Sequence, residues 1–403
     1  MKKLIFSAIL FCILFSSCTS KDDETTAPPT VSSEISGLIT SNKTFVLGTY
    51  TLKGIVKIES GATVTFEAGS TITCDKTTGD NALLVKNGGK LIVNGTAAQP
   101  VIFTEKSEIA GSWGGIIMYG DAPINAIPVN GVGSPTSTSE DGNALPYGGT
   151  NSAHNGGSLK YVQVRYAGSK LADGTKENNG FTFYSCGSGT TLDHLVAYKG
   201  ADDGYEFFGG TVSMTNAISY GNFDDAFDWQ DGWKGQANSN WYAYQINKGN
   251  FGMEIECSNN NNSYFPIITN ITLKRAASCT PEVAGDIQVD AFQFKKEGNG
   301  EFSNIVIDGY GNYPEGTTVY NGAAVKIQDA TTNTNQVNGL KIKLTNIKIT
   351  NTSLEILGAK TGNPSVPISV VFPTGQFTTS ITASGASLLT GAWSKVGSSE
   401  LIQ

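Results

Sequence analysis

The residue types that could do chemistry are concentrated in one stretch of the chain. The segment NFDDAFDWQDGW, residues 222–233, combines several aspartates with Phe and Trp, and ADDGYEFF, residues 201–208, has the same character. Carboxylates at this density suit a hard cation such as Ca²⁺, which takes about six to eight oxygen ligands. They also suit general acid and base catalysis, which hydrolysis of a polysaccharide carries out with paired carboxyl groups. Which of these applies depends on how the fold positions the side chains.

Short segments that open on Gly or Ala and then alternate recur along the chain. They are GFTFY at 180, GYEFF at 204, AFDWQ at 226, GMEIE at 252, AFQFK at 291 and AVKIQ at 324. A second string recurs between them, as in LDHLVA at 192, MTNAIS at 214 and FSNIVI at 302. The shortest step between copies is 22 residues, and the longer steps place the surplus in loops. Because one such unit cannot bury its own apolar face, the repeat predicts a solenoid of stacked parallel strands.

Alternation within these segments predicts which side chains face the interior. The second and fourth positions are apolar in every copy, for example Phe227 and Trp229, and we expect them to point inward. The third position then points outward and reads Glu206, Asp228 and Glu254 in consecutive copies. Acidic residues in the turn before each segment extend this column. The predicted cation-binding residues are Asp202, Asp203, Glu206, Asp224, Asp225, Asp228 and Glu254.

Carboxylates stacked on neighbouring strands repel one another. Two unit charges about 4.8 Å apart cost roughly 3 to 4 kcal/mol at an effective dielectric of about 20. A bound Ca²⁺ ion would relieve this repulsion, and so would raised pKa values that keep some carboxyl groups protonated. The alternative is that solvent and counter-ions screen the column, while Asp and Asn in the turns cap backbone groups. The sequence leaves these alternatives open.

Aromatic residues beside the acidic column suggest a binding platform. Tyr184 and Phe208 occupy the fifth, outward position of the repeat, and Trp233 and Trp241 follow in the next connection. Exposed aromatics next to acidic oxygens suit a polysaccharide or a protein partner, so we predict these four residues as ligand-binding. The alternative is that Trp233 and Trp241 fold under their own loop.

The repeat as a whole resembles the right-handed parallel β-helix proteins of the pectin-lyase-like type. The strings that carry the resemblance are NGTAAQPVIFT at 94, GSWGGI at 111 and LKYVQVRYAG at 159, together with the repeat as far as Ile349. More narrowly, ADDGYEFFGGT, NFDDAFDWQDGW and GMEIECSNNNN resemble an uncharacterised family of bacterial β-helix lipoproteins of the Bacteroidetes type. The predicted fold class is therefore all-β, a right-handed parallel β-helix. The narrower resemblance implies no established activity.

Interruptions of the repeat give the expected domain organisation. We expect the β-helix to cover residues 41–352, with one long loop rich in Pro, Gly, Ser and Asn at 121–157. Residues 353–403 are expected to form a small C-terminal β cap. Such a cap is needed because an open solenoid end exposes both core and strand edges.

The N-terminus resembles a bacterial lipoprotein signal. A basic start and a short apolar run end in FSSC, whose cysteine is Cys18. We expect residues 1–17 to be removed, Cys18 to be lipidated and residues 18–40 to form a flexible tether. The string KDDE in this tether resembles the acidic signal that directs Bacteroidetes lipoproteins to the cell surface. The expected location is therefore the outer membrane, and the alternative is an ordinary secretory signal cut elsewhere.

The motifs that accompany catalysis in polysaccharide-degrading β-helices are incomplete. The doubled aspartates resemble the Asp-Asp pair of polygalacturonases, but the Gly-His-Gly and Arg-Ile-Lys motifs of that family are absent. A lyase would need a cation and a Lys or Arg base, and no lysine has a spacing that marks it as one. His194 stands where other copies have Asn, which indicates a turn or ladder residue. We therefore predict no catalytic residue and keep a lyase or hydrolase as the alternative.

Cysteine and charge content exclude some partners. Cys257 and Cys279 are 22 residues apart and would form a disulfide or remain two buried thiols, and the chain has no CxxC pair typical of zinc sites. Only Arg165 and Arg275 supply guanidinium groups, and the formal net charge is −8, so nucleic acid is not an expected partner.

The expected function is binding or scaffolding at the outer membrane through the lipid anchor. The acidic column would serve as a recognition or Ca²⁺ site, and the partner would be an outer-membrane β-barrel, a transporter or assembly complex, or a polysaccharide. The setting follows from the anchor and the family resemblance.

Overall fold

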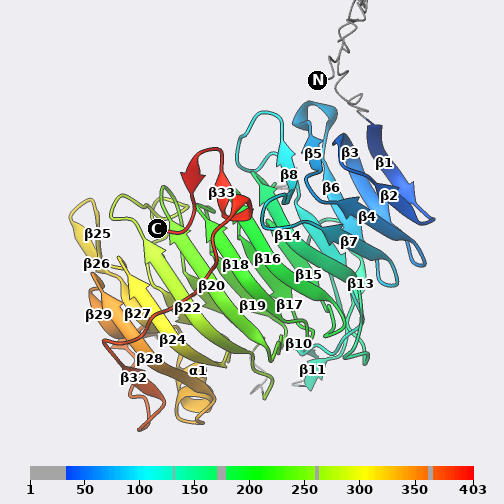
Figure 1. Cartoon of the computed structure of the whole chain (residues 1–403). Coiled ribbons are helices and arrows are strands. Elements are labelled where there is room, and N and C mark those ends of the chain that lie inside the picture. Colours follow the sequence, from blue (N-terminus) through cyan, green and yellow to red (C-terminus); the bar gives the residue numbers. More distant parts are fainter. Residues whose placement is uncertain (1–32, 130–131, 170–177, 259–262, 362–365) are drawn as a thin grey trace, which may run out of the picture. The chain divides into compact units, whose positions relative to one another are not determined.

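The computed structural model shows the repeated segments as parallel strands stacked coil upon coil in one continuous sheet (Figure 1). It describes residues 33–129, 132–169, 178–258, 263–361 and 366–403. The chain winds as a right-handed parallel β-helix, which confirms the predicted fold class. Within these ranges, no helix has both the length and the apolar character that a membrane span requires.

Short strands form the face that carries the acidic column, called here the acidic face. Their first members are β6 (Ala82–Val85), β9 (Ile116–Tyr119), β15 (Phe181–Tyr184), β17 (Tyr205–Phe208) and β19 (Phe227–Gln230). The stack continues through β21 (Met253–Ile255), β23 (Phe292–Phe294), β27 (Ala323–Ile327) and β29 (Leu354–Gly358). Each strand pairs in parallel with the next, so equivalent repeat positions lie side by side.

Longer strands form the other two faces and bend between them. They are β14 (Gly157–Arg165), β16 (Thr191–Tyr198), β18 (Met214–Tyr220), β20 (Asn238–Gln245), β22 (Ile267–Arg275), β24 (Gly300–Asp308) and β28 (Ile342–Thr350), followed by β32 (Phe377–Thr379). The bend falls on one residue with positive φ in each coil, and Asn tolerates this conformation better than most residues. These residues are Tyr161, His194, Asn216, Asn240, Asn270, Asn304 and Asn346.

Side-chain amides connect the bends of successive coils. Asn240 donates to Asn216 at 3.1 Å, Asn304 to Asn270 at 2.7 Å and Asn346 to Asn304 at 3.3 Å. His194 occupies the same bend with φ 56°. The prediction that His194 is a turn or ladder residue is therefore confirmed.

The N-terminal coils begin earlier than predicted. Their strands are β1 (Ser33–Ile39), β2 (Lys43–Phe45), β3 (Thr49–Ile58), β4 (Thr63–Glu67), β5 (Thr71–Cys74), β7 (Lys90–Asn94) and β8 (Val101–Glu105). Because β1 pairs in parallel with β3, the β-helix begins at Ser33 and not at residue 41. Residues 33–39 of the predicted tether thus belong to the first coil. Ile35 is buried there, which supplies the physical reason.

Hairpins and helical turns project from the coils. The hairpins are β10 (Ala126–Val129) with β11 (Val132–Ser134), β12 (Ser137–Thr138) with β13 (Pro146–Tyr147), β25 (Asn312–Glu315) with β26 (Thr318–Asn321), β30 (Lys360–Thr361) with β31 (Val366–Pro367), and β33 (Lys395–Val396) with β34 (Ser399–Glu400). The helical turns are η1 (Lys76–Thr78), α1 (Ala330–Thr332), η2 (Asn333–Val337) and η3 (Ala392–Ser394). The first two hairpins lie in the long loop between β9 and β14, which we call the 121–156 loop.

The core consists of aromatic and aliphatic stacks that run along the coils. Phe181 stacks on Tyr205 with ring centroids 5.1 Å apart, and Tyr205 stacks on Phe227 at 5.3 Å. All three are fully buried, as is Met253 in the next coil. The inward orientation of the second and fourth repeat positions is therefore confirmed.

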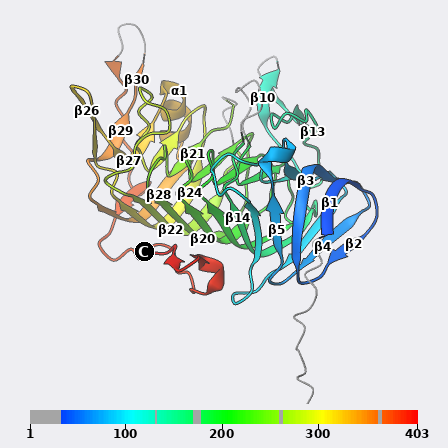
Figure 2. The same cartoon turned by 90° about the horizontal axis from the view of Figure 1, so that it is seen from above.

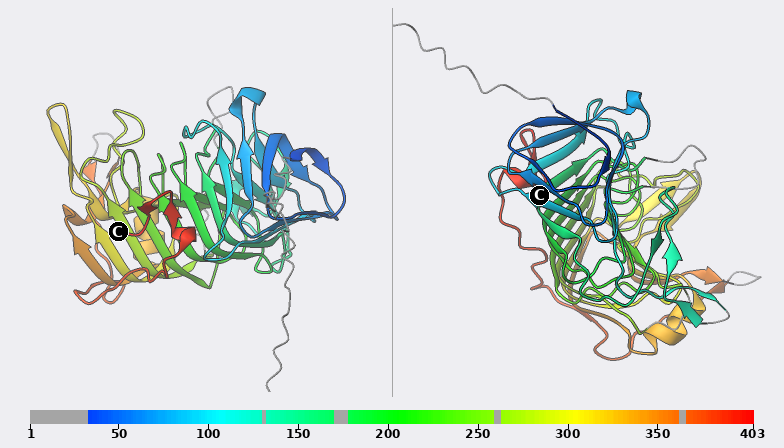
Figure 3. Two further views of the ribbon diagram at one scale, coloured as in Figure 1. Left: turned by 45° about the horizontal axis from the view of Figure 1, so that its top comes forward. Right: turned by 90° about the vertical axis from the view of Figure 1, so that its right-hand side faces the viewer.

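The C-terminal residues lie along the flank of the β-helix, so the prediction of a small cap over 353–403 was wrong in part. β29 and β32 do complete the last coil by pairing with β27 and β28. Residues 380–403, called here the C-terminal strap, instead run back across the long strands (Figures 2 and 3). Ala386 donates its backbone N–H to Thr272 Oγ1 at 2.9 Å, and further along Trp393 donates its own to the Ala97 carbonyl at 3.2 Å.

An apolar outer surface explains why the strap lies there. Outward positions of the long strands carry apolar and aromatic side chains that would otherwise face water. With Trp393 and Leu401 of the strap they form a buried cluster: Tyr166, Val196, Tyr198, Ile218, Tyr220, Tyr242, Trp393 and Leu401. Burial of this surface stabilises the strap against the flank.

Candidate functional site

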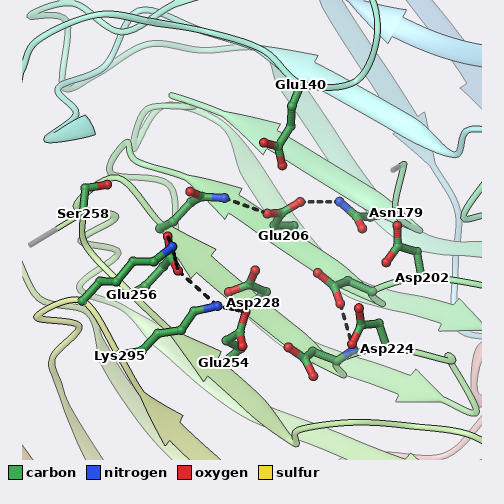
Figure 4. Close-up of a pocket in the computed structure, with 14 residues that line it drawn as sticks. Glu140, Asn179, Asp202, Glu206, Asp224, Asp228, Glu254, Glu256, Ser258 and Lys295 are labelled. Carbon is green, nitrogen blue, oxygen red and sulfur yellow. Dashed lines mark hydrogen bonds and ion pairs between the residues drawn. The ribbon is translucent and has the colours of Figure 1, made fainter. Parts of the chain in front are cut away.

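The acidic column lies on β17, β19 and β21 in the predicted register. Glu206 pairs with Asp228, and Asp228 pairs with Glu254, along adjacent parallel strands. Their neighbours in sequence point into the core, so these carboxylates project from the acidic face (Figure 4). Two uncharged residues bound the acidic column. Thr182 pairs with Glu206 on one side, and Gln293 pairs with Glu254 on the other.

The turns before these strands add two further columns of carboxylates. Asp203 Oδ1 accepts the backbone N–H of Asp225 at 2.8 Å, and Asp225 Oδ1 accepts that of Phe251 at 2.6 Å. Asp290, which lies outside this region, accepts the N–H of Ala323 in the same way at 2.8 Å. One carboxylate oxygen in each of these turns therefore has the backbone-capping role that the sequence left open.

Together these side chains line a cavity of about 670 Å³. We call it the acidic pocket. Its lining residues are Glu140, Asn179, Asp202, Asp203, Glu206, Asp224, Asp225, Asp228, Gln230, Glu254, Glu256, Ser258, Lys295 and Lys296. The structure thus brings all seven predicted cation-binding residues to one pocket, in which carboxylates far outnumber lysines.

The end of the pocket nearest β23 is neutralised by lysines. Lys295 Nζ lies 2.6 Å from Glu254 and 3.2 Å from Glu256, and Lys296 Nζ lies 2.9 Å from Glu256. Burial disfavours the charged form of Lys295, but Glu254, Glu256 and Asp228 outweigh that effect and raise its pKa. Lys295 therefore stays protonated, and Glu254 and Glu256 have partners already.

The three carboxylates at the centre of the pocket form no ion pair with a described residue, although the charge of Lys295 partly lowers the pKa of Asp228. Oxygens of Asp203, Glu206 and Asp228 all lie within 4.8 Å of one another, and all three side chains are buried. Asn179 donates to Glu206 Oε2 at 2.5 Å and Gln230 donates to Glu206 Oε1 at 3.1 Å. Asp228 Oδ1 is buried and has no hydrogen-bond partner among the described residues. We call Asp203, Glu206 and Asp228 the carboxylate triad.

Burial and mutual repulsion raise the pKa values in this region. Desolvation is the largest cause for Asp203, Glu206, Asp225 and Asp228 alike. Repulsion by like charges adds to it, the largest contribution coming from Asp224 for Asp203 and Asp225, from Asp228 for Glu206, and from Glu254 for Asp228. The pocket can therefore relieve its charge by holding protons or by holding a cation.

A second group of carboxylates adjoins the triad. Oxygens of Asp202, Asp203 and Asp224 also lie within 4.8 Å of one another, so Asp203 is common to both groups. Asp224 accepts a hydrogen bond from the Asn250 side chain. Oxygen ligands from adjacent coils thus surround Asp203 on two sides, a donor set that fits a hard cation.

The prediction of exposed aromatic ligand-binding residues was wrong. Tyr184 and Phe208 do point away from the core, but the 121–156 loop covers them, and Tyr147 packs on Tyr184 at 4.9 Å between ring centroids. Trp233 and Trp241 belong to the main core, where their indole N–H groups donate to backbone carbonyls at 2.9 Å. All four side chains are at most 2 % exposed and cannot contact a ligand in this structure.

Of the two alternatives that the sequence left open for Cys257 and Cys279, the structure has the second: both residues are buried free thiols, and no disulfide joins them. Cys257 follows β21, and its backbone N–H binds the Lys296 carbonyl of the next coil, whereas Cys279 follows β22 on another face. The 22-residue spacing therefore joins two faces of the coil instead of equivalent positions. Cys18, with the signal and most of the tether, lies outside the described residues.

Several pocket residues were not predicted as site residues. Asn179 and Gln230 donate hydrogen bonds to Glu206, and Lys295 and Lys296 form ion pairs at one end of the pocket. All four lie in or beside the repeat and could have been identified from the neighbouring repeat positions. Glu140 could not, because it belongs to the 121–156 loop, whose path carries no repeat signal.

Comparison with known proteins gives a family but no close relative. The family model described as "Pectate-lyase like beta helix domain" matches residues 37–395. No curated protein and no solved structure gives a significant match.

Proposed function

The chain belongs to the pectate-lyase-like β-helix family, and from this premise we propose that it is a binding protein whose acidic pocket holds a hard divalent cation of the Ca²⁺ class. One observation carries the proposal: the buried Asp228 Oδ1 has no hydrogen-bond partner among the described residues and lies in a triad of mutually close carboxylates. An unsatisfied buried carboxylate oxygen is costly, and a cation would satisfy it.

The donor chemistry supports calcium over softer metals. The described pocket residues offer carboxylate and amide oxygens, with Ser258 as a hydroxyl, and no histidine or cysteine side chain. Hard cations prefer such oxygens, and Ca²⁺ tolerates the irregular geometry that strands of a solenoid supply. The triad would provide the central ligands, with Asp202 and Asp224 on the side of Asp203.

Polysaccharide cleavage at the same pocket is the second candidate function, because the family is named for a lyase. The raised pKa of Glu206 would let it donate a proton, as a glycoside hydrolase requires. A lyase also needs a base, and Lys295 is held protonated by Glu254 and Glu256. Binding without turnover is therefore the better-supported function.

The catalytic candidate has a direct test. We expect the purified protein, incubated with uronic-acid polysaccharides and Ca²⁺, to give neither unsaturated products nor new reducing ends. Appearance of either product in the wild-type protein, and its loss in Glu206→Gln, would show an enzyme and overturn the binding-only proposal.

The setting of this function is proposed from the sequence. We place the protein at the outer membrane, lipidated on Cys18 and exposed at the cell surface. There it would act beside an outer-membrane β-barrel complex, a transporter or assembly machine, or bind a polysaccharide through the cation. Metabolic labelling with a palmitate analogue, absent in Cys18→Ser, tests the anchor.

Calcium titration calorimetry tests the cation directly. We expect wild-type protein to bind Ca²⁺ and Asp228→Asn to bind at least about tenfold more weakly, because the substitution removes a charged central ligand. Asp286→Asn makes the same change at an exposed loop position and should bind as the wild type does. Absence of both heat and a thermal shift in the wild type would leave the pocket as screened surface.

A further inference from the structure

The geometry of the carboxylate triad recurs further along the β-helix. Lys326 on β27 has the repeat position that Asp228 has on β19, because the strands between them pair in register. The other two members correspond in the same way, so the counterparts of Asp203, Glu206 and Asp228 are Asp290, Gln293 and Lys326. We call this second set the lysine triad. It keeps oxygen-bearing side chains at two positions and has a lysine at the third.

Hydrogen bonds show that the two triads share their local geometry. Asp203 and Asp290 each use Oδ1 to accept, at 2.8 Å, the backbone N–H of the turn residue in the next coil. In both triads the second member is hydrogen bonded to a glutamine of the next coil: Gln230 with Glu206 at 3.1 Å, and Gln328 with Gln293 at 3.2 Å. In both aspartates the cap leaves the Oδ2 atom for another partner.

The lysine triad shows what that second oxygen binds. Lys326 Nζ lies 3.4 Å from Asp290 Oδ2 and 5.1 Å from the centroid of the Phe251 ring. Asp290 is buried and Lys326 is only partly exposed, so the chain places its own ammonium group at this point of the coil. The aspartate charge is thereby compensated.

The carboxylate triad has the same frame without the ammonium. Among the described residues, no ion pair joins it to a lysine or arginine, since Lys295 pairs with Glu254 and Glu256. Asp228 is 7 % exposed, and its buried Oδ1 has no hydrogen-bond partner in the described part of the chain. The place that Lys326 Nζ takes beside Asp290 is therefore lined by oxygens in the carboxylate triad.

We propose that the cation of the acidic pocket lies against Asp203 Oδ2, at the place that corresponds to Lys326 Nζ, and that residue 228 determines how this place is filled. A lysine at this repeat position supplies the positive charge from the chain itself. An aspartate there makes a site for an ion from solution and adds a ligand to it. The inference rests on the proposed function and specifies where the ion binds.

Asp228→Lys tests the inference directly. We expect the affinity for Ca²⁺ in calorimetry to fall at least about 100-fold, because the ammonium takes the place of the ion. In chelator the variant should melt at a higher temperature than Asp228→Asn, because only lysine gives Asp203 and Glu206 a positive partner. Asp286→Lys makes the same charge change at an exposed loop position and should bind Ca²⁺ as the wild type does.

The reverse exchange tests the same inference by gain of function. Gln293→Glu/Lys326→Asp rebuilds the carboxylate triad around Asp290, so calorimetry should show a second Ca²⁺ ion bound per chain. Gln293→Glu alone keeps the lysine and should bind no ion beyond that of the wild type. This control separates a site made by residue 326 from an effect of one added carboxylate.

Either experiment can contradict the inference. Wild-type affinity in Asp228→Lys, a melting temperature in chelator no higher than that of Asp228→Asn, or no second ion in Gln293→Glu/Lys326→Asp would each overturn it. Failure of the wild type to bind Ca²⁺ would instead refute the proposed function. The comparison of Asp228→Lys with Asp228→Asn in chelator would then still decide whether residue 228 faces a place for a positive charge.

Discussion

In calcium-free buffer, the melting temperature of the protein is expected to fall as the pH rises from about 5 to about 8. Four buried carboxyl groups, Asp203, Glu206, Asp225 and Asp228, have pKa values raised well above 3.8 for Asp and 4.5 for Glu. A raised folded-state pKa adds stability that is complete below the unfolded pKa and is lost as the pH climbs through the folded pKa. The stability conferred by these protons therefore begins to be lost above about pH 4 to 5 and continues to fall as the pH rises through the raised pKa values.

The size of the effect follows from linkage. One pKa unit corresponds to about 1.4 kcal/mol, so each unit by which the folded-state pKa of a pocket carboxyl exceeds its unfolded value lowers the unfolding free energy at high pH by that amount. For a chain of this length, about 1.4 kcal/mol is a fall of about 2 °C in melting temperature. Scanning calorimetry in chelator across the pH range measures it.

Calcium should reverse this trend. A cation binds the deprotonated pocket, so its stabilising effect grows as the pH rises and the protons leave. At about pH 8 the added ion should restore the melting temperature, and at about pH 5 it should have little effect. A melting temperature that rises with pH in chelator would contradict the prediction, since it would mean that the pocket carboxylates are stabilised in their charged form.

Asp228→Asn is the variant that isolates the pocket. It should flatten the pH dependence in chelator because one of the coupled acids is gone, whereas Asp286→Asn should keep the wild-type slope. The buried His154 acts in the opposite direction: burial lowers its pKa below 6.5, so its charging costs stability as the pH falls. Comparison of two variants that both retain His154 cancels this contribution.

The register of the acidic column could be predicted from sequence because two constraints agree. Alternation fixes which of Phe227 and Asp228 faces inward, and the recurrence of that alternation in neighbouring coils fixes the partner of each strand. A slip by one residue would have moved Trp229 to the surface and Asp228 into the core. The position of Glu206, Asp228 and Glu254 on adjacent strands is accordingly found in the structure.

Contacts made by segments outside the repeat could not be predicted. Tyr184 and Phe208 were correctly placed outside the solenoid core, but nothing in their own coils shows that Tyr147 of the loop covers them. Burial depends there on tertiary packing of a non-repeating segment, which local pattern does not encode. For the same reason, Glu140 was not among the predicted site residues.

The sequence does contain an indication that the flank of the β-helix is covered. Val196, Ile218 and Tyr242 stand at outward positions of the long strands, where a solvated face would carry polar residues. Three apolar residues in line on an outer face indicate that another part of the chain covers them. Only the structure shows that the cover is the last segment of the chain.

Replacement of Trp393 by alanine is expected to cost about 3 to 5 kcal/mol of unfolding free energy, as for other fully buried tryptophans. Trp393 is 1 % exposed and packs against His194 and Tyr161, with ring centroids 4.8 and 6.1 Å away. Its indole N–H also donates to the Leu389 carbonyl at 2.9 Å. The substitution therefore removes both the apolar contact and a hydrogen bond that hold the strap.

Chemical denaturation followed by circular dichroism measures this cost, and hydrogen exchange locates it. Amides of residues 380–403 should lose protection in Trp393→Ala, because the strap detaches before the coils beneath it unfold. Leu389→Ala, which changes an 84 % exposed side chain of the same strap, should shift the unfolding free energy by less than about 0.5 kcal/mol. Equal behaviour of the two variants would mean that the strap contributes no stability, and the apolar flank formed by Val196, Ile218 and Tyr242 would then need another cover.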